Sequence, residues 1–158
     1  KRMKRRHLAR DVIRFCDEAR RRRPDIVFGA DIIAGFPTET TAAHKASLDL
    51  INRAGITFLH VFPFSPRQGT PAALMPQLDG GLIRGRAAEL RDFGKIRQSI
   101  LFENSVGSRD QILVETGNMG HGRNYSRMQL LGDYVAAGSL VDVTVKETRD
   151  DLLVVQRC

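Results

Sequence analysis

The sequence has 158 residues, 42% of them hydrophobic, and carries a formal net charge of +7 with a pI of about 10.1. This length fits one or two small domains, and the composition excludes a membrane protein because no apolar run approaches the length of a membrane span. The basic balance favours a polyanionic partner such as nucleic acid, although basic surfaces also serve solubility alone. Cys16 and Cys158 have neither metal-ligand spacing nor the density of a disulfide framework, which fits a reducing cytoplasm.

The amino-terminal segment predicts a basic helix. Apolar residues recur at helical spacing from Leu8 to Ala19, with Cys16 on the apolar face, and the run Arg20–Arg23 precedes the stop signal Pro24. We interpret the arginine run as a solvated helix end rather than a specific nucleic-acid contact, since most charge runs face water. Because the chain opens directly in this pattern and without a methionine, we expect it to be a segment of a longer protein.

The next segment predicts a strand, a helix and a second strand. Residues 26–34 and 56–64 are continuous apolar runs, and the helical pattern between them ends at Gly55. Two buried strands joined by a helix form a parallel βαβ unit with a right-handed crossover. His44, near the start of the helix, is interpreted as a surface or capping residue. His60, inside the second strand, is interpreted as a hydrogen-bonded core residue rather than a group that reaches a site inside a barrel.

Both strands run into loops at the carboxyl end of the predicted sheet. The first loop contains Gly35 and Pro37, and a threonine among residues 38–41 is placed to cap the following helix. The second loop, residues 63–73, combines a hydroxyl, a guanidinium and a glycine, which suits a carboxylate or a phosphate. Ligands of parallel α/β sheets and barrels bind at this end, so two neighbouring loops indicate a site. A capped βα turn without a ligand is the alternative.

The remainder predicts a long helix followed by short strands. An apolar stripe from Ile83 to Ile100, which includes Ile96, is expected to pack against the sheet. From about Gly107 the pattern changes to short strands with glycine turns, which indicates a small antiparallel barrel. In Gly122–Arg127 two arginines accompany an aromatic ring, so both phosphate pairing and base stacking are available. The predicted strands are residues 112–114, 125–131, 141–145 and 152–155.

Several motifs resemble those of the radical S-adenosylmethionine (SAM) methylthiotransferases. Residues 31–40, DIIAGFPTET, are similar to the family block D-I-I-V-G-F-P-G-E-T, and residues 64–73, FSPRQGTPAA, are similar to Y-S-x-R-x-G-T-x-A. Residues 3–5 resemble the M-x-R that follows an earlier strand. In the tail, Val114-Glu115 and Gly122–Tyr125 resemble the TRAM domain, an RNA-binding β-barrel. The resemblance extends over essentially the whole chain in family order.

This resemblance implies a fold that is α/β followed by all-β. Residues 1–105 are expected to form the second half of a radical SAM (βα) partial TIM barrel, and residues 106–158 a small antiparallel TRAM barrel. The open edge of half a barrel exposes apolar surface and unpaired backbone, so the isolated segment is expected to aggregate or dimerise. Two positions depart from the family pattern: Thr38 replaces a glycine, and His44 replaces a phenylalanine and leaves the packing beneath that helix open.

The cysteines of the family are missing from this sequence. Neither the C-x-x-x-C-x-x-C motif nor the amino-terminal cysteines are present, and thiolates are what bind such clusters. The resemblance therefore implies two 4Fe–4S clusters held by the remainder of the same polypeptide, with no metal ligand and no catalytic residue in this segment. The segment alone is expected to be inactive.

The resemblance is strongest to the MtaB branch, on residues 60–65. That branch is a set of cytoplasmic tRNA-modifying transferases that add a 2-methylthio group to threonylcarbamoyl-adenosine beside the anticodon. The MiaB branch, acting on isopentenyl-adenosine, is the alternative. RimO, acting on a ribosomal protein, comes third, and a non-catalytic RNA-binding module remains open. By motif position, the SAM-binding residues are Ile33, Gly35, Phe36, Ser65 and Arg67, and the tRNA-binding residues are Arg123, Asn124, Tyr125 and Arg127.

Overall fold

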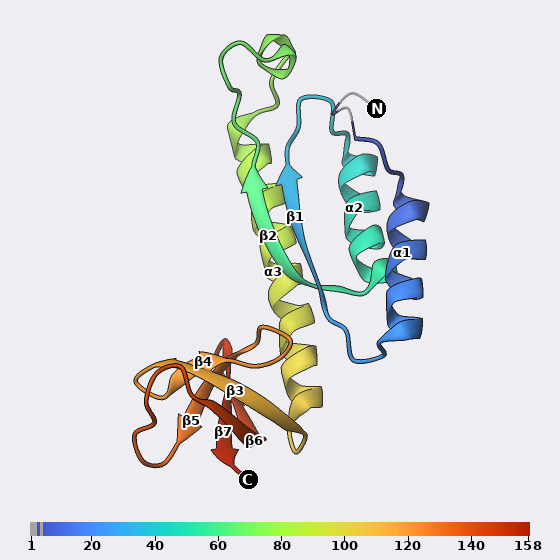
Figure 1. Cartoon of the computed structure of the whole chain (residues 1–158). Helices are drawn as coiled ribbons and strands as arrows, with labels where there is room; N and C mark the ends of the chain where they lie inside the picture. Colours follow the sequence, from blue (N-terminus) through green and yellow to red (C-terminus); the bar gives the residue numbers. More distant parts are fainter. Residues whose placement is uncertain (1–2, 4) are drawn as a thin grey trace. The chain divides into compact units, whose positions relative to one another are not determined.

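The computed structural model describes residue 3 and residues 5–158. The chain divides into two compact units, Lys1–Arg97 and Gln98–Cys158, and the long helix α3 (Gly80–Ser105) contributes to both (Figure 1). Within the described residues, no helix combines the length and the apolar character needed to cross a membrane. Each unit has its own hydrophobic core and is described separately below.

The first unit is a parallel βαβ arrangement, as predicted. The strands β1 and β2 pair in parallel, with Asp31 opposite His60 in the register. The hydroxyl of Thr40 accepts a hydrogen bond from the Ala43 amide at 3.1 Å and caps the crossover helix, and Gly55 ends it with φ 61°. The elements of this unit, besides α3, are α1 (Ala9–Arg22), β1 (Phe28–Ala34), α2 (Thr41–Ala54), β2 (Ile56–Pro63) and the 3₁₀ helix η1 (Pro71–Leu74).

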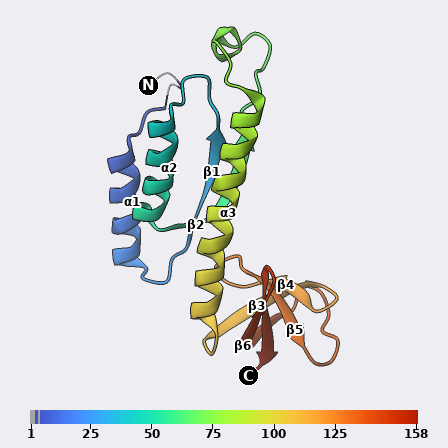
Figure 2. The ribbon, with the colours of Figure 1, turned by 180° about the vertical axis from the view of Figure 1, so that it is seen from behind.

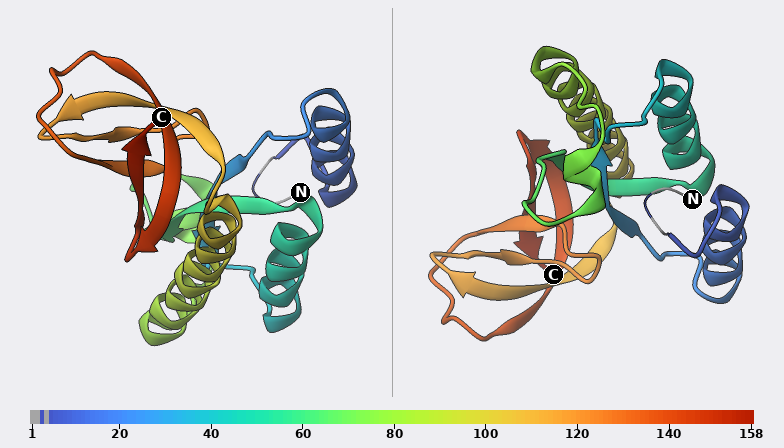
Figure 3. Two further views of the ribbon diagram at one scale, coloured as in Figure 1. Left: turned by 90° about the horizontal axis from the view of Figure 1, so that it is seen from below. Right: turned by 90° about the horizontal axis from the view of Figure 1, so that it is seen from above.

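Within the described part of the first unit, one face of this two-stranded sheet is covered and the other is open. Helices α2 and α3 lie on the same side of the strands, and α1 packs beside α2 (Figures 2 and 3). The guanidinium of Arg91 donates to the Val61 carbonyl at 3.1 Å and fixes α3 on β2. On the uncovered side, His60 is exposed and half of the Phe62 side chain (52%) remains accessible. The core on the covered side contains Cys16, Ala34, Ile51, Ala54, Ile56, Val61, Ala87 and Leu90.

Three predictions about individual side chains are wrong. His44 is buried (4% exposed) rather than on the surface, because α2 turns it toward Glu39 and Glu89. His60 is exposed rather than in the core, because it points to the uncovered face of the sheet. Ile96 and Ile100 on α3 are 57% and 49% exposed, so the predicted apolar stripe packs only along its first half.

The second unit is a closed barrel in which the strands neighbour one another in the order β3-β4-β5-β7-β6. The prediction of an antiparallel barrel is wrong for one neighbouring pair, since β5 and β7 run parallel with Met128 opposite Leu153. The cause is topological: β6 lies between them in sequence, and the β6–β7 hairpin returns the chain in the direction of β5. The strands are β3 (Arg109–Thr116), β4 (Met119–His121), β5 (Arg127–Leu131), β6 (Leu140–Arg149) and β7 (Leu152–Arg157).

Strand β4 is the one barrel strand that the sequence pattern does not reveal. It has three residues and contains Gly120, and glycine in a sequence pattern predicts a turn. In the fold, a Cβ atom on Gly120 would lie 1.9 Å from the Leu113 carbonyl oxygen, so only glycine permits this pairing. The barrel core comprises Phe102 at the end of α3 with Ile112, Val114, Met128, Leu130, Val143, Val145 and Leu153 to Val155.

Candidate functional site

The end of β1 and the loop after β2 line one pocket, whereas the loop after β1 contributes no residue to it. Its volume is about 580 Å³, within the usual range for small-molecule sites. Ile33 contributes from β1, and Ser65 and Arg67 contribute from the loop after β2. The other lining residues are Arg5, Asp31, Phe62, Pro63, Phe64, Thr70 and Ala72.

The turn at Gly35, which follows β1, depends on glycine. Gly35 has φ 79°, and a Cβ atom there would lie 2.7 Å from the side chain of Ile83 on α3. The rings of Phe36 and Phe64 meet edge to face at 5.4 Å and join the two loops. The Phe64 amide also donates to the Ala34 carbonyl at 2.8 Å, which extends the sheet by one hydrogen bond.

A buried ion pair supports this turn from behind. The guanidinium of Arg86 donates to the Glu39 carboxylate at 2.9 Å and to the Glu39 carbonyl at 2.8 Å. The second carboxylate oxygen accepts from the Gly35 amide at 3.2 Å, so that amide points inward rather than toward the pocket. Both charged side chains are nearly buried, at 7% exposed for Arg86 and 12% for Glu39. No local sequence pattern predicts this pair, because its members are 47 residues apart.

His44 completes the buried cluster. Its Nε2 lies 2.8 Å from a carboxylate oxygen of Glu89, and its Nδ1 lies 3.8 Å from the Glu39 carboxylate. Within the described residues, Nδ1 is buried without a hydrogen-bond partner. The imidazole thus sits between two acidic side chains, which explains how a polar ring fits beneath α2.

A second pocket of about 410 Å³ shares Arg5 and Ile33 with the first. Met3 and Phe36 also line it, so two residues of the segment 3–5 reach the strand ends. Lys4 lies outside the described residues. Of the residues predicted for the SAM site, Ile33, Ser65 and Arg67 share the first pocket, Phe36 lines the second, and Gly35 lines neither.

The first pocket combines apolar walls with an available cation. Ile33 is 36% exposed and Phe62 is 52% exposed, so both present apolar surface to a ligand. Arg67 is exposed, and its guanidinium has no hydrogen bond or ion pair to any residue that the structure describes. The Arg67 carbonyl accepts the Thr70 hydroxyl at 2.7 Å, which fixes the loop backbone. Such a site suits a ligand with a flat apolar part and a carboxylate.

The barrel carries the second candidate region, the turn between β4 and β5. Tyr125 has φ 68° and is 78% exposed. Its ring stacks on His121, with centroids 4.8 Å apart and planes at 25°, and His121 is held by Glu115 at 2.9 Å. The sequence did not predict this stack, which depends on the short strand β4. It offers an ordered aromatic surface to a planar group such as a nucleobase.

The other residues predicted to bind RNA have internal partners. Arg127 pairs with Asp151 at 2.9 Å, and Arg123 lies 3.8 Å from the Asp110 carboxylate. The Asn124 side chain accepts the Ser126 amide at 3.0 Å and shapes the turn. Both arginines remain more than half exposed, so each is open to a phosphate on its free side.

The described residues contain no group of three or more His, Cys, Asp or Glu arranged to hold a metal ion. Cys16 is buried in the helix packing of the first unit, and Cys158 is exposed at the end of the chain. Burial raises the pKa of the Cys16 thiol, which Arg20 lowers and Asp17 raises to smaller extents. The donor set of an iron–sulfur cluster is therefore not offered by this part of the chain.

No family model matches the sequence. It is 44% identical over 140 residues to threonylcarbamoyladenosine tRNA methylthiotransferase MtaB of Rickettsia prowazekii, over 89% of this chain and 33% of that protein. It is 38% identical over 129 residues to a tRNA-2-methylthio-N(6)-dimethylallyladenosine synthase of Maricaulis maris, over 78% of this chain and 28% of that protein.

An archaeal relative matches nearly the whole chain. The sequence is 33% identical over 160 residues to a probable threonylcarbamoyladenosine tRNA methylthiotransferase of Archaeoglobus fulgidus, over 98% of this chain and 37% of that protein. The chain thus spans about a third of the length of the curated relatives that it matches. Bacterial and archaeal relatives alike are methylthiotransferases or methylthio-forming synthases of tRNA, and this chain belongs to that family, the radical SAM methylthiotransferases.

Proposed function

We propose that this chain is part of a tRNA methylthiotransferase that adds a 2-methylthio group to threonylcarbamoyl-adenosine beside the anticodon. Its first unit would be the second half of a radical SAM partial barrel, and its second unit a TRAM domain. The uncovered face of the β1–β2 sheet supports the first assignment, because the interior of a barrel needs further strands of the same polypeptide. The closed five-stranded barrel supports the second.

The observation that carries the proposal is the pocket shared by Ile33, Ser65 and Arg67. Arg67 would pair with the carboxylate of the SAM methionyl group, and Ser65 would donate a hydrogen bond at the same rim. Ile33, with Phe36 in the adjoining pocket, would contact the adenine, and Gly35 would shape the turn that presents them. Bound SAM would supply the methyl group and the radical chemistry of the reaction. The clusters that this chemistry needs would be held elsewhere in the polypeptide, because the described residues do not fit them.

SAM affinity of the full-length parent protein tests the pocket. Arg67→Ala should weaken SAM binding by about tenfold or more, since a charge-assisted hydrogen bond contributes about 1.5–3 kcal/mol. Arg84→Ala removes an exposed guanidinium from α3, outside the pocket lining, and should leave the affinity unchanged. Equal affinities of the two variants would contradict the assignment of Arg67.

The tRNA assignment rests on the exposed Tyr125 ring. Arg123 and Arg127 would contact phosphates beside it, and Asn124 would hold the turn. Tyr134 offers a matched control, because it is the other tyrosine and is equally exposed, at 77% against 78%. Tyr125→Ala should lower tRNA affinity about tenfold, since stacking contributes about 1–3 kcal/mol per base, whereas Tyr134→Ala should not.

The substrate is decided by nucleoside mass spectrometry of tRNA from cells with and without the parent gene. Loss of the methylthio group from threonylcarbamoyl-adenosine alone is the expected result. Loss from dimethylallyl-adenosine instead would favour the second function, for which relatives of that name such as the one from Maricaulis maris argue. No change in either nucleoside would leave a ribosomal-protein substrate or a non-catalytic RNA-binding module.

A further inference from the structure

The positive charge of the chain is concentrated in its first residues and not in the barrel. Residues 1–23 contain eleven Lys or Arg against three Asp or Glu, which gives a net charge of +8. The unit Gln98–Cys158 contains six Lys or Arg against eight Asp or Glu and carries −2. The electrostatic attraction of a polyanion to this chain therefore comes from the segment that includes α1.

The arginines of this segment differ in how far their charge is already neutralised. Arg20 points inward, where it donates to the Gly55 carbonyl at 3.2 Å and lies 4.9 Å from the Phe28 ring centroid. Arg21 and Arg22 share the carboxylate of Glu18. The run that stands out in the sequence is thus largely satisfied within the fold, which agrees with its interpretation as a helix end.

The first turns of α1 behave differently. Arg10 is exposed and has no ion pair among the described residues. Arg14 is 84% exposed and reaches Asp11 only at 3.7 Å. Arg53, on the neighbouring helix α2, is 61% exposed and lies 3.4 Å from Asp49. Exposed pairs of this length contribute little, so these three guanidinium groups are available to an external anion.

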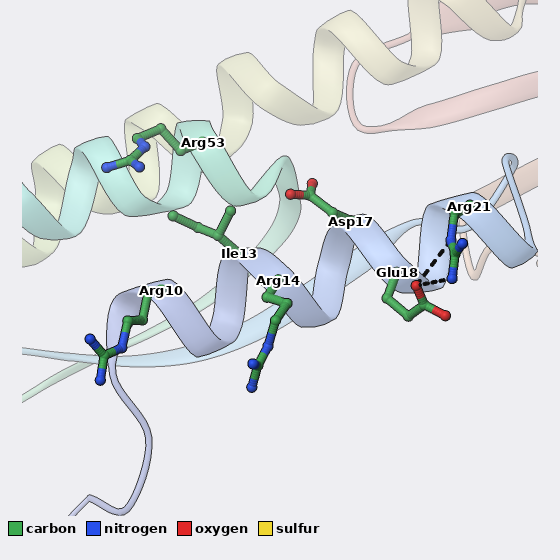
Figure 4. A pocket seen from close by; sticks show the side chains of 7 residues that line it. All are labelled: Arg10, Ile13, Arg14, Asp17, Glu18, Arg21 and Arg53. Atoms are coloured by element: carbon green, nitrogen blue, oxygen red, sulfur yellow. Dashed lines mark hydrogen bonds and ion pairs between the residues drawn. The ribbon is translucent and has the colours of Figure 1, made fainter.

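These side chains line one shallow groove between α1 and α2, of about 410 Å³. Arg10 and Arg14 are four residues apart and therefore lie on one face of α1, about 6 Å apart along its axis. Figure 4 shows Arg10 and Arg14 extending from one side of α1, Ile13 extending from α1 toward α2, and Arg53 on α2. Toward the carboxyl end of α1 the groove is lined by Asp17, Glu18 and Arg21, and Arg21 is paired with Glu18.

We propose that this cationic end, Arg10, Arg14 and Arg53, is a second contact surface for tRNA that binds the phosphate backbone. The inference rests on the proposed function, which makes tRNA the substrate. The barrel unit has an aromatic surface for a base, but its net negative charge does not attract the phosphates of a polyanion. The α1 face would supply this electrostatic attraction. The contact is to phosphates, so it adds affinity without sequence preference.

The test is tRNA binding by the full-length parent protein over a series of salt concentrations. The triple variant Arg10→Gln, Arg14→Gln, Arg53→Gln should reduce the slope of log affinity against log salt by about 2, because each lost phosphate contact removes about 0.7–0.9. At about 0.1 M salt this corresponds to an affinity loss of about 100-fold. The corresponding triple Lys variant should have the same slope as the parent. A phosphate contact needs the positive charge and not the bidentate geometry of the guanidinium group.

Lys95→Gln is the matched control, because Lys95 is 77% exposed and pairs with Asp92 at 3.5 Å in the same i, i+3 geometry as Arg14. It should leave the slope unchanged. Tyr125→Ala should lower affinity at every salt concentration without changing the slope, since stacking releases no counterions.

A triple Gln variant that binds tRNA with the parent slope would overturn this inference alone. A parent protein that does not bind tRNA would overturn the proposed function with it. If the triple Gln variant loses the parent's binding to anionic phospholipid vesicles but keeps its tRNA binding, the face would be assigned to a membrane. That result would also overturn this inference.

Discussion

Arg86→Met should destabilise the first unit by about 3 kcal/mol. The substitution removes the cation from a nearly buried pair and leaves the Glu39 carboxylate with the Gly35 amide as its remaining hydrogen-bond donor. Breaking a buried pair on one side costs about 3–5 kcal/mol, and the amide bond places the expected loss at the lower end. The double variant Glu39→Gln, Arg86→Met removes the stranded charge as well and should recover about 2 kcal/mol of the loss.

The thiol of Cys16 provides a local probe for this experiment. It is 3% exposed in the core of the first unit, so its labelling in urea reports the unfolding of that unit and not of the barrel. The measurement uses the chain with Cys158→Ser as background. A loss of about 3 kcal/mol moves the midpoint by about 2 M urea at a slope of about 1.5 kcal/mol/M.

Arg84→Met is the matched control, since it makes the same change at an exposed position of the same helix. It should change the stability by less than about 0.5 kcal/mol. A loss below about 1 kcal/mol for Arg86→Met, or equal losses for both variants, would refute the reasoning, because it would mean that Glu39 is well solvated without its partner.

Three further changes test the turn, the barrel and the thiols. Gly35→Ala should cost about 2–4 kcal/mol in urea unfolding, from its positive φ and the isoleucine 2.7 Å away, whereas Gly69→Ala, with φ 80° and open space, should cost only about 1–2. Ser126→Ala should leave the barrel's thermal stability unchanged or raise it by up to about 1 kcal/mol, because the buried hydroxyl has no partner among the described residues. At pH 8, iodoacetamide should modify Cys158 quickly and Cys16 only on unfolding. Burial raises the pKa of the Cys16 thiol, so its contribution to stability is present below the usual thiol range and is lost as the pH rises through the folded value.

The elements of the first unit follow from local rules, which is why their prediction succeeds. A continuous apolar run, a threonine cap and Gly55 at the helix end are signals within a few residues of the feature that they specify. The placement of the two loops also follows, because parallel strands bring their carboxyl ends to one edge. Ile33 at the end of β1 and Arg67 in the loop after β2 accordingly line one pocket.

The side-chain environments depend on contacts that no local pattern contains. Whether His60 is covered depends on what lies on the far side of the sheet, and nothing in the sequence of β2 states it. His44 is buried because its ring lies between the carboxylates of Glu39 and Glu89, which belong to two other segments of the chain. The short strand β4 was not predicted from the sequence. Its glycine is required because the carbonyl of a neighbouring strand leaves no room for a side chain, and no local pattern shows this.

One residue type serves three purposes in this chain, and its internal partners decide which. Arg86 is buried against Glu39 and holds a turn, and Arg20 binds backbone carbonyls at the end of α2. Arg10 and Arg67 have no internal partner among the described residues, so their charge is directed outward. In the net charge of +7, Glu39 already offsets Arg86, whereas Arg10 and Arg67 have no such carboxylate partner among the described residues. A basic composition therefore indicates a polyanionic partner only after the paired arginines are set aside, and the cations that remain include those of the first turns of α1 and of the loop after β2. On this view, Arg10 attracts a polyanion over distance and Arg67 binds a small anion. The two arginines belong to the same unit and can be substituted one at a time.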